Sequence, residues 1–340
     1  MPVFKAGLLL IAAVSTFSGW ASAAQDVTQN SDPTQKQNPE SLWIIEYEND
    51  LFAGADRFYT SGIRLTRVAE ARSPPSWLES VARRFPGFED ADTLPYSLSI
   101  SHNIFTPADI ENPQFPPNDR LYAGWLNVEF KTGTLQRDGS DLVRAAIGIA
   151  GPAAGGKQLQ KSIHRLIDTR RPVGWSEQLE NEPTLLLGYE RIRRIRPLST
   201  PTGRRFDASY FGGLTLGNAY THVSAGGFMR WGSRLSNDYG PPRITPAVSG
   251  SAFFKPNGRT WYFFVGTEGR AVGRDLFIEG NTFGGRDGVD PERLVGELFA
   301  GFVFSQGRFR LTYNHIWRSR EFKVQDGSQD YGALSLSLWW

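Results

Sequence analysis

The last ten residues of the chain, 331–340, read YGALSLSLWW, in which Leu334, Leu336 and Leu338 alternate with Ser335 and Ser337. The leucines fall on one face of an extended segment, and the serines fall on the other. Because successive side chains of a β-strand point to opposite faces, this pattern predicts a strand with one apolar and one polar face. The same two-residue rhythm recurs upstream in LWIIEYE, LYAGWLNVEFK, WYFFVGTEGRAV and RFRLTYNHIWR.

The alternating segments predict about twelve strands in an all-β fold. They cover residues 42–48, 60–68, 95–105, 121–131, 142–150, 184–195, 205–216, 221–231, 260–272, 293–304, 308–318 and 331–340. An even number of strands returns both chain ends to one side of a membrane, as closed single-chain barrels require. A final amphipathic strand with a terminal aromatic residue is typical of bacterial outer-membrane barrels. We therefore predict a transmembrane antiparallel β-barrel over residues 41–340, with a soluble β-sandwich as the alternative.

The composition favours the barrel. Mean hydropathy is −0.36, yet aromatic residues reach 13%, with 10 Trp, 11 Tyr and 23 Phe. A polar average with many aromatics is expected when lipid-facing side chains occupy alternate positions and Trp and Tyr gather at the membrane interfaces. No run of 18 apolar residues predicts a transmembrane helix. The absence of cysteine excludes disulfides and thiolate metal sites.

The first 23 residues have the pattern of a signal peptide. Lys5 precedes the apolar run AGLLLIAAV, and Ala21-Ser22-Ala23 is a small-residue cleavage site. Residues 24–40 are polar and contain proline, so we expect a flexible lead-in. The formal net charge of +2 becomes +1 when Lys5 is removed, and this near balance gives no indication of nucleic-acid binding.

If the first strand rises from the periplasm, residues 49–59, 106–120, 151–183 and 273–292 form extracellular loops. Residues 69–94 are then periplasmic, and WLESVARRF within them could form a short amphipathic helix. The loop 151–183 contains GPAAGGKQLQKSIHRLIDTRRPVGW, in which a glycine-rich stretch precedes a helical pattern. We therefore predict a short helix in an extracellular loop.

That helix carries the most interesting of the four histidines. His102, His222 and His315 lie in strand-like segments, where a wall or lumen position is expected, whereas His164 lies on the loop helix. Leu159, Ile163, Leu166 and Ile167 predict its apolar face.

Gln160, His164 and Asp168 recur every four residues and predict a neighbouring polar face. A histidine has an unperturbed pKa of about 6.5, so its neutral ring can act as a general base near neutral pH. An ordinary surface histidine is the alternative.

The stretch YENDLFAGADRFYTSG, at the junction of the first two predicted strands, concentrates hard oxygen donors. Asn49 and Asp50 are adjacent, with Glu48 and Asp56 nearby. Ca²⁺ binds six to eight such oxygens. The pattern is no EF-hand, so a solvated acidic turn is the alternative. No G-x-S-x-G motif, phosphate loop or zinc signature is present.

Four motifs together resemble the lipid A 3′-O-deacylase family (LpxR). They are YENDLFAGADRFYTSG, DRLYAGW at 119–125, GPAAGGKQLQKSIHRLI at 151–167 and GWSEQLENEP at 174–183. They occur in the order and spacing of that family, and the resemblance spans essentially the whole mature chain.

The resemblance implies an outer-membrane enzyme that hydrolyses the 3′-linked acyloxyacyl ester of lipid A in the outer leaflet, with Ca²⁺ as cofactor. It implies Asn49 and Asp50 as the metal-binding pair, His164 as the catalytic base, and Gln160 and Thr60 as catalytic residues that position water or substrate. Ca²⁺ would stabilise the oxyanion, much as in secreted phospholipase A2. Asp168 is our own suggestion for a residue that orients the imidazole. No protein partner is implied.

The sequence also departs from this family. The lysine that the family carries after the third strand has no counterpart in TPADIENPQFPPNDR, where Arg120 is the nearest cation, and Arg170 replaces a glutamate of some members. Two alternatives therefore stay open. The chain could hydrolyse another outer-membrane lipid, as a phospholipase does, or it could be a barrel without enzymatic activity, such as a pore.

Overall fold

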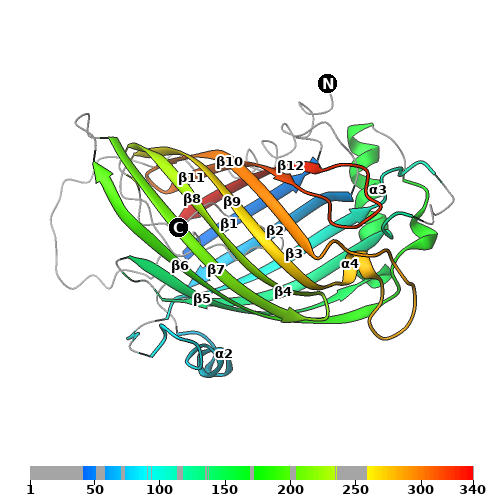
Figure 1. The fold of residues 1–340 in the computed structure, drawn as a ribbon, viewed down its shortest axis with the longest axis horizontal. Helices are drawn as coiled ribbons and strands as arrows, with labels where there is room; N and C mark the ends of the chain where they lie inside the picture. Colours follow the sequence, from blue (N-terminus) through cyan, green and yellow to red (C-terminus); the bar gives the residue numbers. More distant parts are fainter. Residues whose placement is uncertain are drawn as a thin grey trace, which may run out of the picture.

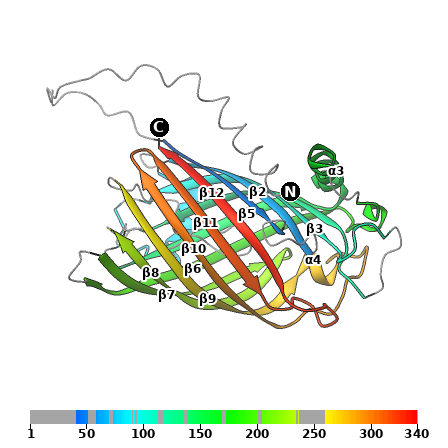
Figure 2. The same cartoon turned by 90° about the horizontal axis from the view of Figure 1, so that it is seen from above.

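The protein forms a closed barrel of twelve antiparallel strands in which each strand pairs with its neighbours in sequence and β1 pairs with β12 (Figures 1 and 2). This computed structural model describes residues 41–50, 58–69, 73–89, 91–92, 94–112, 118–134, 136, 138–168, 172–199, 204–233, 235 and 259–339. The predicted signal peptide and lead-in, Asp56 and Arg170 lie outside the described residues. Among the helices described, none is long and apolar enough to cross a membrane.

The predicted all-β barrel is confirmed, and each predicted segment corresponds to one strand. The strands are β1 Ser41–Asn49, β2 Phe58–Ala69, β3 Tyr96–Thr106, β4 Ala123–Gly133, β5 Gly139–Ala150, β6 Glu182–Ser199, β7 Arg204–Gly217, β8 Tyr220–Ser233, β9 Thr260–Asp275, β10 Leu294–Gln306, β11 Phe309–Arg318 and β12 Gln329–Trp339. Short helices occupy the connections, namely α2 Ser76–Ala82, η3 Pro152–Ala154, α3 Gly156–Ile167, η4 Trp175–Glu177 and α4 Leu276–Glu279. Both views place α3 and α4 at the same end of the barrel.

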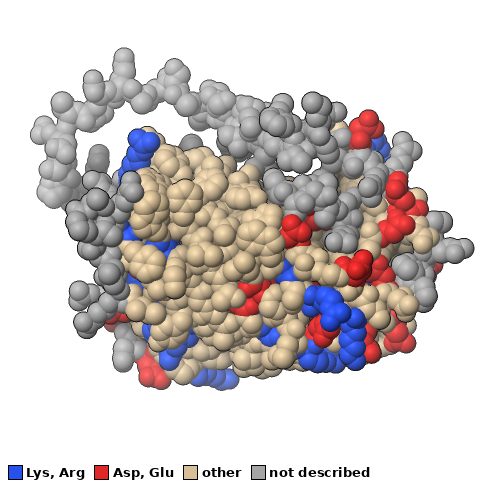
Figure 3. Space-filling model, turned by 45° about the horizontal axis from the view of Figure 1, so that its top comes forward, with Lys and Arg blue, Asp and Glu red and all other residues tan. Residues whose placement is uncertain are grey.

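The outer surface of the barrel is largely apolar. Alternate strand residues expose large hydrophobic side chains there, among them Trp43, Ile100, Leu185, Val223 and Phe263. Figure 3 shows the result as a broad uncharged area over the wall, with Lys, Arg, Asp and Glu gathered toward its margins. This is the surface that a hydrocarbon environment requires of a barrel.

The other set of alternate residues fills the interior with paired charges. Glu129 lies 3.8 Å from Arg64, 3.5 Å from Lys131 and 3.2 Å from Arg144, all of them buried. On the far wall, Glu297 pairs with Arg270 and, at 2.7 Å, with Arg318. Charges removed from water are tolerated where they are paired in this way. The described lumen therefore contains networks of paired charges.

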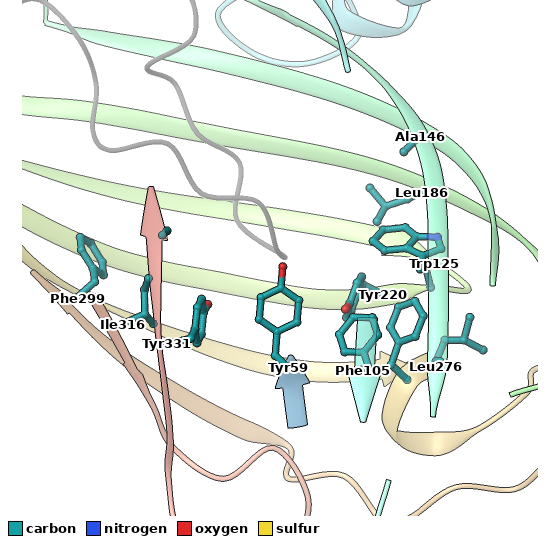
Figure 4. Packing of buried hydrophobic residues seen from close by; sticks show 14 of the residues in the cluster. Tyr59, Phe105, Trp125, Ala146, Leu186, Tyr220, Leu276, Phe299, Ile316 and Tyr331 are labelled. Atoms are coloured by element: carbon teal, nitrogen blue, oxygen red, sulfur yellow. The ribbon is translucent and has the colours of Figure 1, made fainter. Parts of the chain in front are cut away.

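A hydrophobic plug lies in the lumen near the end that carries α3. The turn α4 follows β9 and buries Leu276, Phe277 and Ile278 almost completely. The Phe277 ring stacks on Phe105 with centroids 4.3 Å apart and contacts Trp125 at 5.3 Å. Figure 4 shows aromatic and aliphatic side chains of this cluster converging from several strands and from α4. Phe277 of α4 thus packs into the lumen at this end.

The expected helix in the connection between β2 and β3 is α2, and it packs against the outside of the wall (Figure 1). Leu78 and Ala82 of α2 are buried in a cluster with Val143 of β5. The Phe85 ring, just after the helix, stacks on Tyr189 of β6 with centroids 4.9 Å apart. One patch of the apolar wall is therefore covered by protein.

Candidate active site

Helix α3 lies directly on the barrel wall because two glycines meet there. A Cβ atom on Gly124 of β4 would stand 2.9 Å from the nitrogen of Gly156, and a Cβ on Gly156 would stand 2.9 Å from the Gly124 Cα. Either methyl group would push helix and strand apart. The turn before the helix is fixed as well, because His102 Nε2 of β3 donates a hydrogen bond of 2.8 Å to the carbonyl oxygen of Ala154.

The helix turns the predicted polar face with Gln160 and His164 toward the protein, and not its leucines and isoleucines. Gln160 is 1% exposed and His164 is 5% exposed, whereas Leu166 is 64% exposed. Leu159 and Ile163 flank the buried side and are only half-buried. Burying an amide and an imidazole in place of a leucine is costly unless they have partners, so this face is built for a polar task.

The amide of Gln160 is oriented by a tryptophan. Trp175 of η4 is 1% exposed, and its Nε1 donates a 2.8 Å hydrogen bond to Gln160 Oε1. An indole nitrogen can only donate, so the bonded amide atom must be the oxygen. The Gln160 Nε2 is consequently a buried donor without a partner in the part of the chain that the structure describes. Trp175 itself packs against Tyr122 with the two rings tilted by 42° and their centroids 4.9 Å apart.

The wall beneath α3 is the outward face of β3, not the lumen. Along β3, His102, Ile104 and Thr106 share this face, since Asn103 and Phe105 point inward. Ile104 is 1% exposed although it faces outward, because Leu159 of α3 and Trp175 pack in its cluster. The site thus lies between a helix and the bilayer side of the barrel.

Thr60 and Asn49 continue this face across the neighbouring strands. The pairing of β2 with β3 shifts register between Tyr59 and Ser61, which places Thr60 in a β-bulge. Its hydroxyl lies 2.7 Å from that of Thr106, and its carbonyl oxygen accepts a 2.9 Å hydrogen bond from Asn49 Nδ2. Bulges often re-aim a side chain beside an active site. A line of contacts therefore runs from Asn49 through Thr60 and Thr106 toward the wall under α3.

Asn49 and Asp50 form the candidate metal-binding pair. They are 5% and 0% exposed, at the end of β1. The bond from Asn49 Nδ2 to the Thr60 carbonyl oxygen fixes the orientation of the Asn49 amide, and Asp50 is the next residue in the chain. A buried amide and carboxylate are hard oxygen donors that suit Ca²⁺, which also takes oxygens from backbone, water or substrate. No group of three or more His, Asp or Glu side chains that could hold a metal is found among the described residues.

Two nearby carboxylates have other positions. Glu48 accepts a 2.8 Å hydrogen bond from the Tyr59 hydroxyl on the lumen side of the wall. Asp168 ends α3 in the left-handed conformation with φ 55°, and its backbone N–H donates to the carbonyl oxygen of His164. The Asp168 side chain is exposed, so its link to His164 runs through the backbone.

Comparisons with known proteins decide which family these features belong to. A model of the family described as "Outer membrane protein LpxR" matches residues 8–340. The chain belongs to the LpxR family. Among solved structures, it is similar to LpxR from Salmonella typhimurium, with 18% identity, a TM-score of 0.73 and coverage of 88% of this chain and 99% of that one. No curated protein matches significantly.

Other outer-membrane barrels match less well. The β domain of the Bordetella autotransporter BrkA has 10% identity and a TM-score of 0.45, with 88% of this chain and 99% of that one covered. The translocator domain of NalP from Neisseria meningitidis has 9% identity and a TM-score of 0.35, with 90% of each chain covered. Membership of the LpxR family and the closed barrel together place the protein in the outer membrane.

Within this LpxR-family chain, Arg120 joins loops and is not an exposed cation. Its side chain is 1% exposed, lies 3.5 Å from Glu321 and donates at 3.3 Å to the Phe277 carbonyl oxygen in the plug. Burial alone would raise the pKa of Glu321, but Arg318 and Arg120 hold it below its ordinary value. Arg120 therefore ties three connections at the same end of the barrel together, and its position does not suit it to replace the lysine expected after β3.

The remaining histidines lie on the barrel wall, as predicted. His222 is buried in the lumen on β8, and His315 of β11 lies 3.5 Å from Asp330. His102 is on the outer wall, but its contact with Ala154 gives it a role in placing α3 that the sequence did not indicate. Trp175 was likewise missed, although it stands in the motif GWSEQLENEP.

Proposed function

We propose that this protein hydrolyses the 3′-linked acyloxyacyl ester of lipid A in the outer leaflet. The observation that carries the proposal is the buried polar face of α3, with Gln160 and His164, held against the bilayer side of the wall. A lipid ester can reach such a site without leaving the membrane. Membership of the LpxR family supports this choice of substrate.

His164 acts as the general base in the proposed reaction. Its ring accepts a proton from a water molecule, and the water oxygen attacks the carbonyl carbon of the ester. The bond from that carbon to the sugar oxygen then breaks. The proton passes from His164 to the departing oxygen, which gives a free 3′-hydroxyl and an acyloxyacyl fatty acid.

Gln160 and Thr60 orient the reacting groups. The Gln160 Nε2, fixed as a donor by Trp175, donates to an oxygen of the substrate or of the attacking water. A donor held in place before the reaction stabilises developing charge without reorganisation. The Thr60 hydroxyl, in its bulge beside Thr106, positions the substrate from the wall side.

Asn49 and Asp50 would hold Ca²⁺, which supplies Lewis-acid stabilisation of the negative charge that develops on the ester oxygen. The second alternative, a passive pore, is poorly supported. Glu129 and its three cationic partners occupy part of the described lumen, and Phe277 lies in the plug. A water-filled pore needs an open channel.

The test is mass analysis of lipids after incubation of the purified protein with lipid A, and separately with phospholipid vesicles. We expect loss of the 3′ acyloxyacyl mass from lipid A with the wild type but not with His164→Ala, and no change in phospholipid. Asp168→Asn serves as a matched control on the same helix, because its exposed side chain makes no contact with the reacting groups. Fatty acid released only from phospholipid would replace the proposed substrate, and intact lipids in both incubations would refute an esterase.

A further inference from the structure

One side of α3, next to the buried face with Gln160 and His164, carries a row of exposed cations. Lys157, Lys161 and Arg165 follow one another every four residues, and all three side chains are exposed. Residues four apart lie on the same side of a helix, so the three charges form one row about 12 Å long. This row is the cationic edge of α3.

The cationic edge does not stabilise the helix itself. Like charges four residues apart repel each other, and α3 contains no acidic residue that could offset them. Lys157 lies in the first turn, where the helix dipole disfavours a cation. In the part of the chain that the structure describes, no side-chain hydrogen bond or ion pair joins the three cations to another residue. A negatively charged group from outside the chain would therefore stabilise the row.

The β3–β4 connection brings its carboxylates to the opposite side of α3. Asp109 and Glu111 are exposed and flank Ile110. Ile110 belongs to the cluster against which Leu159 packs, and Leu159 and Lys161 are about 160° apart around the helix axis. These two carboxylates therefore lie away from the cationic edge.

Three other carboxylates near α3 leave the edge positively charged. Glu177 of η4 pairs with Arg286. Glu180 is exposed, and its backbone lies beside Gly151 before the helix, whereas Asp168 directly follows the helix. Even if Glu180 and Asp168 each offset one charge, one of the three cations remains uncompensated.

The cationic edge borders the site of the proposed reaction. His164 directly precedes Arg165 and follows Lys161 by three residues, so its ring and the row are neighbours on the helix. Helix α3 lies outside the wall, at the end of the barrel that carries α4 (Figures 1 and 2). A lipid whose ester lies between His164 and the wall therefore has its headgroup beside the cationic edge.

We propose that the cationic edge binds a phosphate group of the lipid that is hydrolysed. This inference rests on the proposed function, because it assigns the phosphate to lipid A itself. A phosphate monoester carries more than one negative charge and three acceptor oxygens, so several cationic side chains can bind it together. The bound phosphate holds the lipid with its ester at His164, and a lipid A molecule without phosphate binds less tightly.

The first test measures binding without turnover, in protein inactivated by His164→Ala. Native mass spectrometry in detergent compares lipid A, dephosphorylated lipid A and phosphatidylglycerol. The cationic edge is removed by Lys157→Gln, Lys161→Gln and Arg165→Gln, which keep good helix formers on exposed positions. We expect this triple variant to bind lipid A about tenfold more weakly and to bind dephosphorylated lipid A unchanged. Unchanged affinity for lipid A would refute the proposal.

A matched triple variant removes the same charge from the same end of the barrel. Arg293, Arg320 and Lys323 are exposed, and each pairs with a carboxylate of its own connections. Their replacement by glutamine should leave the affinity for lipid A unchanged. Equal weakening by both triple variants would show long-range attraction only and overturn the site. An equal loss of affinity for phosphatidylglycerol would assign the edge to any anionic lipid and refute a phosphate of the substrate.

Steady-state kinetics separate this inference from the proposed reaction. In protein that retains His164, loss of the cationic edge should raise KM for lipid A about tenfold and leave kcat unchanged. Lys161→Arg, which keeps the charge, should retain the KM of the wild type, whereas Lys161→Gln should raise it. A fall in kcat at constant KM would refute a binding role. If the wild type leaves lipid A intact, the proposed function is refuted, and the binding test still decides whether the cationic edge holds the phosphate.

Discussion

Replacing Trp175 with phenylalanine tests whether an aromatic residue outside the reacting groups controls the orientation of Gln160. The substitution removes the indole N–H that donates to Gln160 Oε1 at 2.8 Å. It keeps a ring that can stack on Tyr122, so packing of the cluster is largely preserved. The expected change is therefore in the direction of one amide group.

The size of the effect follows from the burial of that amide. A buried acceptor that loses its donor costs about 1–3 kcal/mol. In Trp175→Phe, a half-turn of the Gln160 amide moves Oε1 away from the place where the indole N–H was and relieves this cost. The same rotation turns Nε2 away from the substrate or water to which it would donate. A preference of about 1.4 kcal/mol for the rotated amide leaves roughly one molecule in ten in the working orientation. We therefore expect kcat for lipid A deacylation to fall about tenfold, with little change in KM.

Steady-state deacylation of lipid A, followed by mass spectrometry of the product, measures this effect. Tyr122→Phe is the control, since it removes a buried hydrogen bond of 3.1 Å to the Ile110 carbonyl oxygen in the same cluster without touching Gln160. It should lower stability by about 0.5–1.5 kcal/mol but leave kcat unchanged.

A double variant shows whether Trp175 acts through Gln160. In a chain that already carries Gln160→Ala, adding Trp175→Phe should have no further effect on kcat, because residues that act as a unit are not additive. The reasoning is refuted if Trp175→Phe lowers kcat to the same extent in the presence and absence of Gln160. Equal losses of kcat in Trp175→Phe and Tyr122→Phe would also refute it.

Three other substitutions have defined outcomes. Gly124→Ala should displace α3 and abolish deacylation while the barrel still shows its heat-dependent gel shift; full activity would contradict the close contact of helix and strand. Phe277→Ala should lower stability by about 3–5 kcal/mol and raise conductance in planar bilayers; a closed, equally stable barrel would show that the ring does not plug it. The pKa of Glu321 is lowered in the folded state. The contribution of Glu321 to the free energy of unfolding is therefore complete above pH 4.5 and is lost as the pH falls through the pKa of the folded state. The stability difference between wild type and Glu321→Gln should shrink below pH 4.5, and a difference independent of pH would exclude this linkage.

The barrel could be predicted from sequence because its signal is repeated in every strand. A strand with one face in lipid and one in a packed lumen must alternate, so LSLSLWW and its counterparts specify both the strand and its orientation. Long connections were also correctly placed, including the helix with His164. The plug could not be predicted, because the short segment LFIE has no periodicity that distinguishes a turn folded into the lumen from an exposed loop.

The orientation of α3 shows a second limit. The sequence predicted an apolar face and a neighbouring polar face but did not indicate which one contacts the barrel; Gly156, Gln160 and His164 face the protein, and Leu166 is exposed. The reason lies in three dimensions: Gly124 and Gly156 allow close contact along one side of the helix only, and that side carries the polar residues. The hydrophobic pattern of a helix gives no information on a close backbone contact that is possible only because both residues are glycines.

The central claim is that Asn49 and Asp50 hold a calcium ion on the outer wall, facing His164. A crystal structure of the purified protein grown with Ca²⁺ tests it most directly. We predict one cation with oxygens of both residues at about 2.3–2.6 Å, and a water molecule about 2.6–3.2 Å from a ring nitrogen of His164. A cation bound elsewhere, or an imidazole directed to bulk solvent with Asn49 and Asp50 out of reach, would contradict the claim.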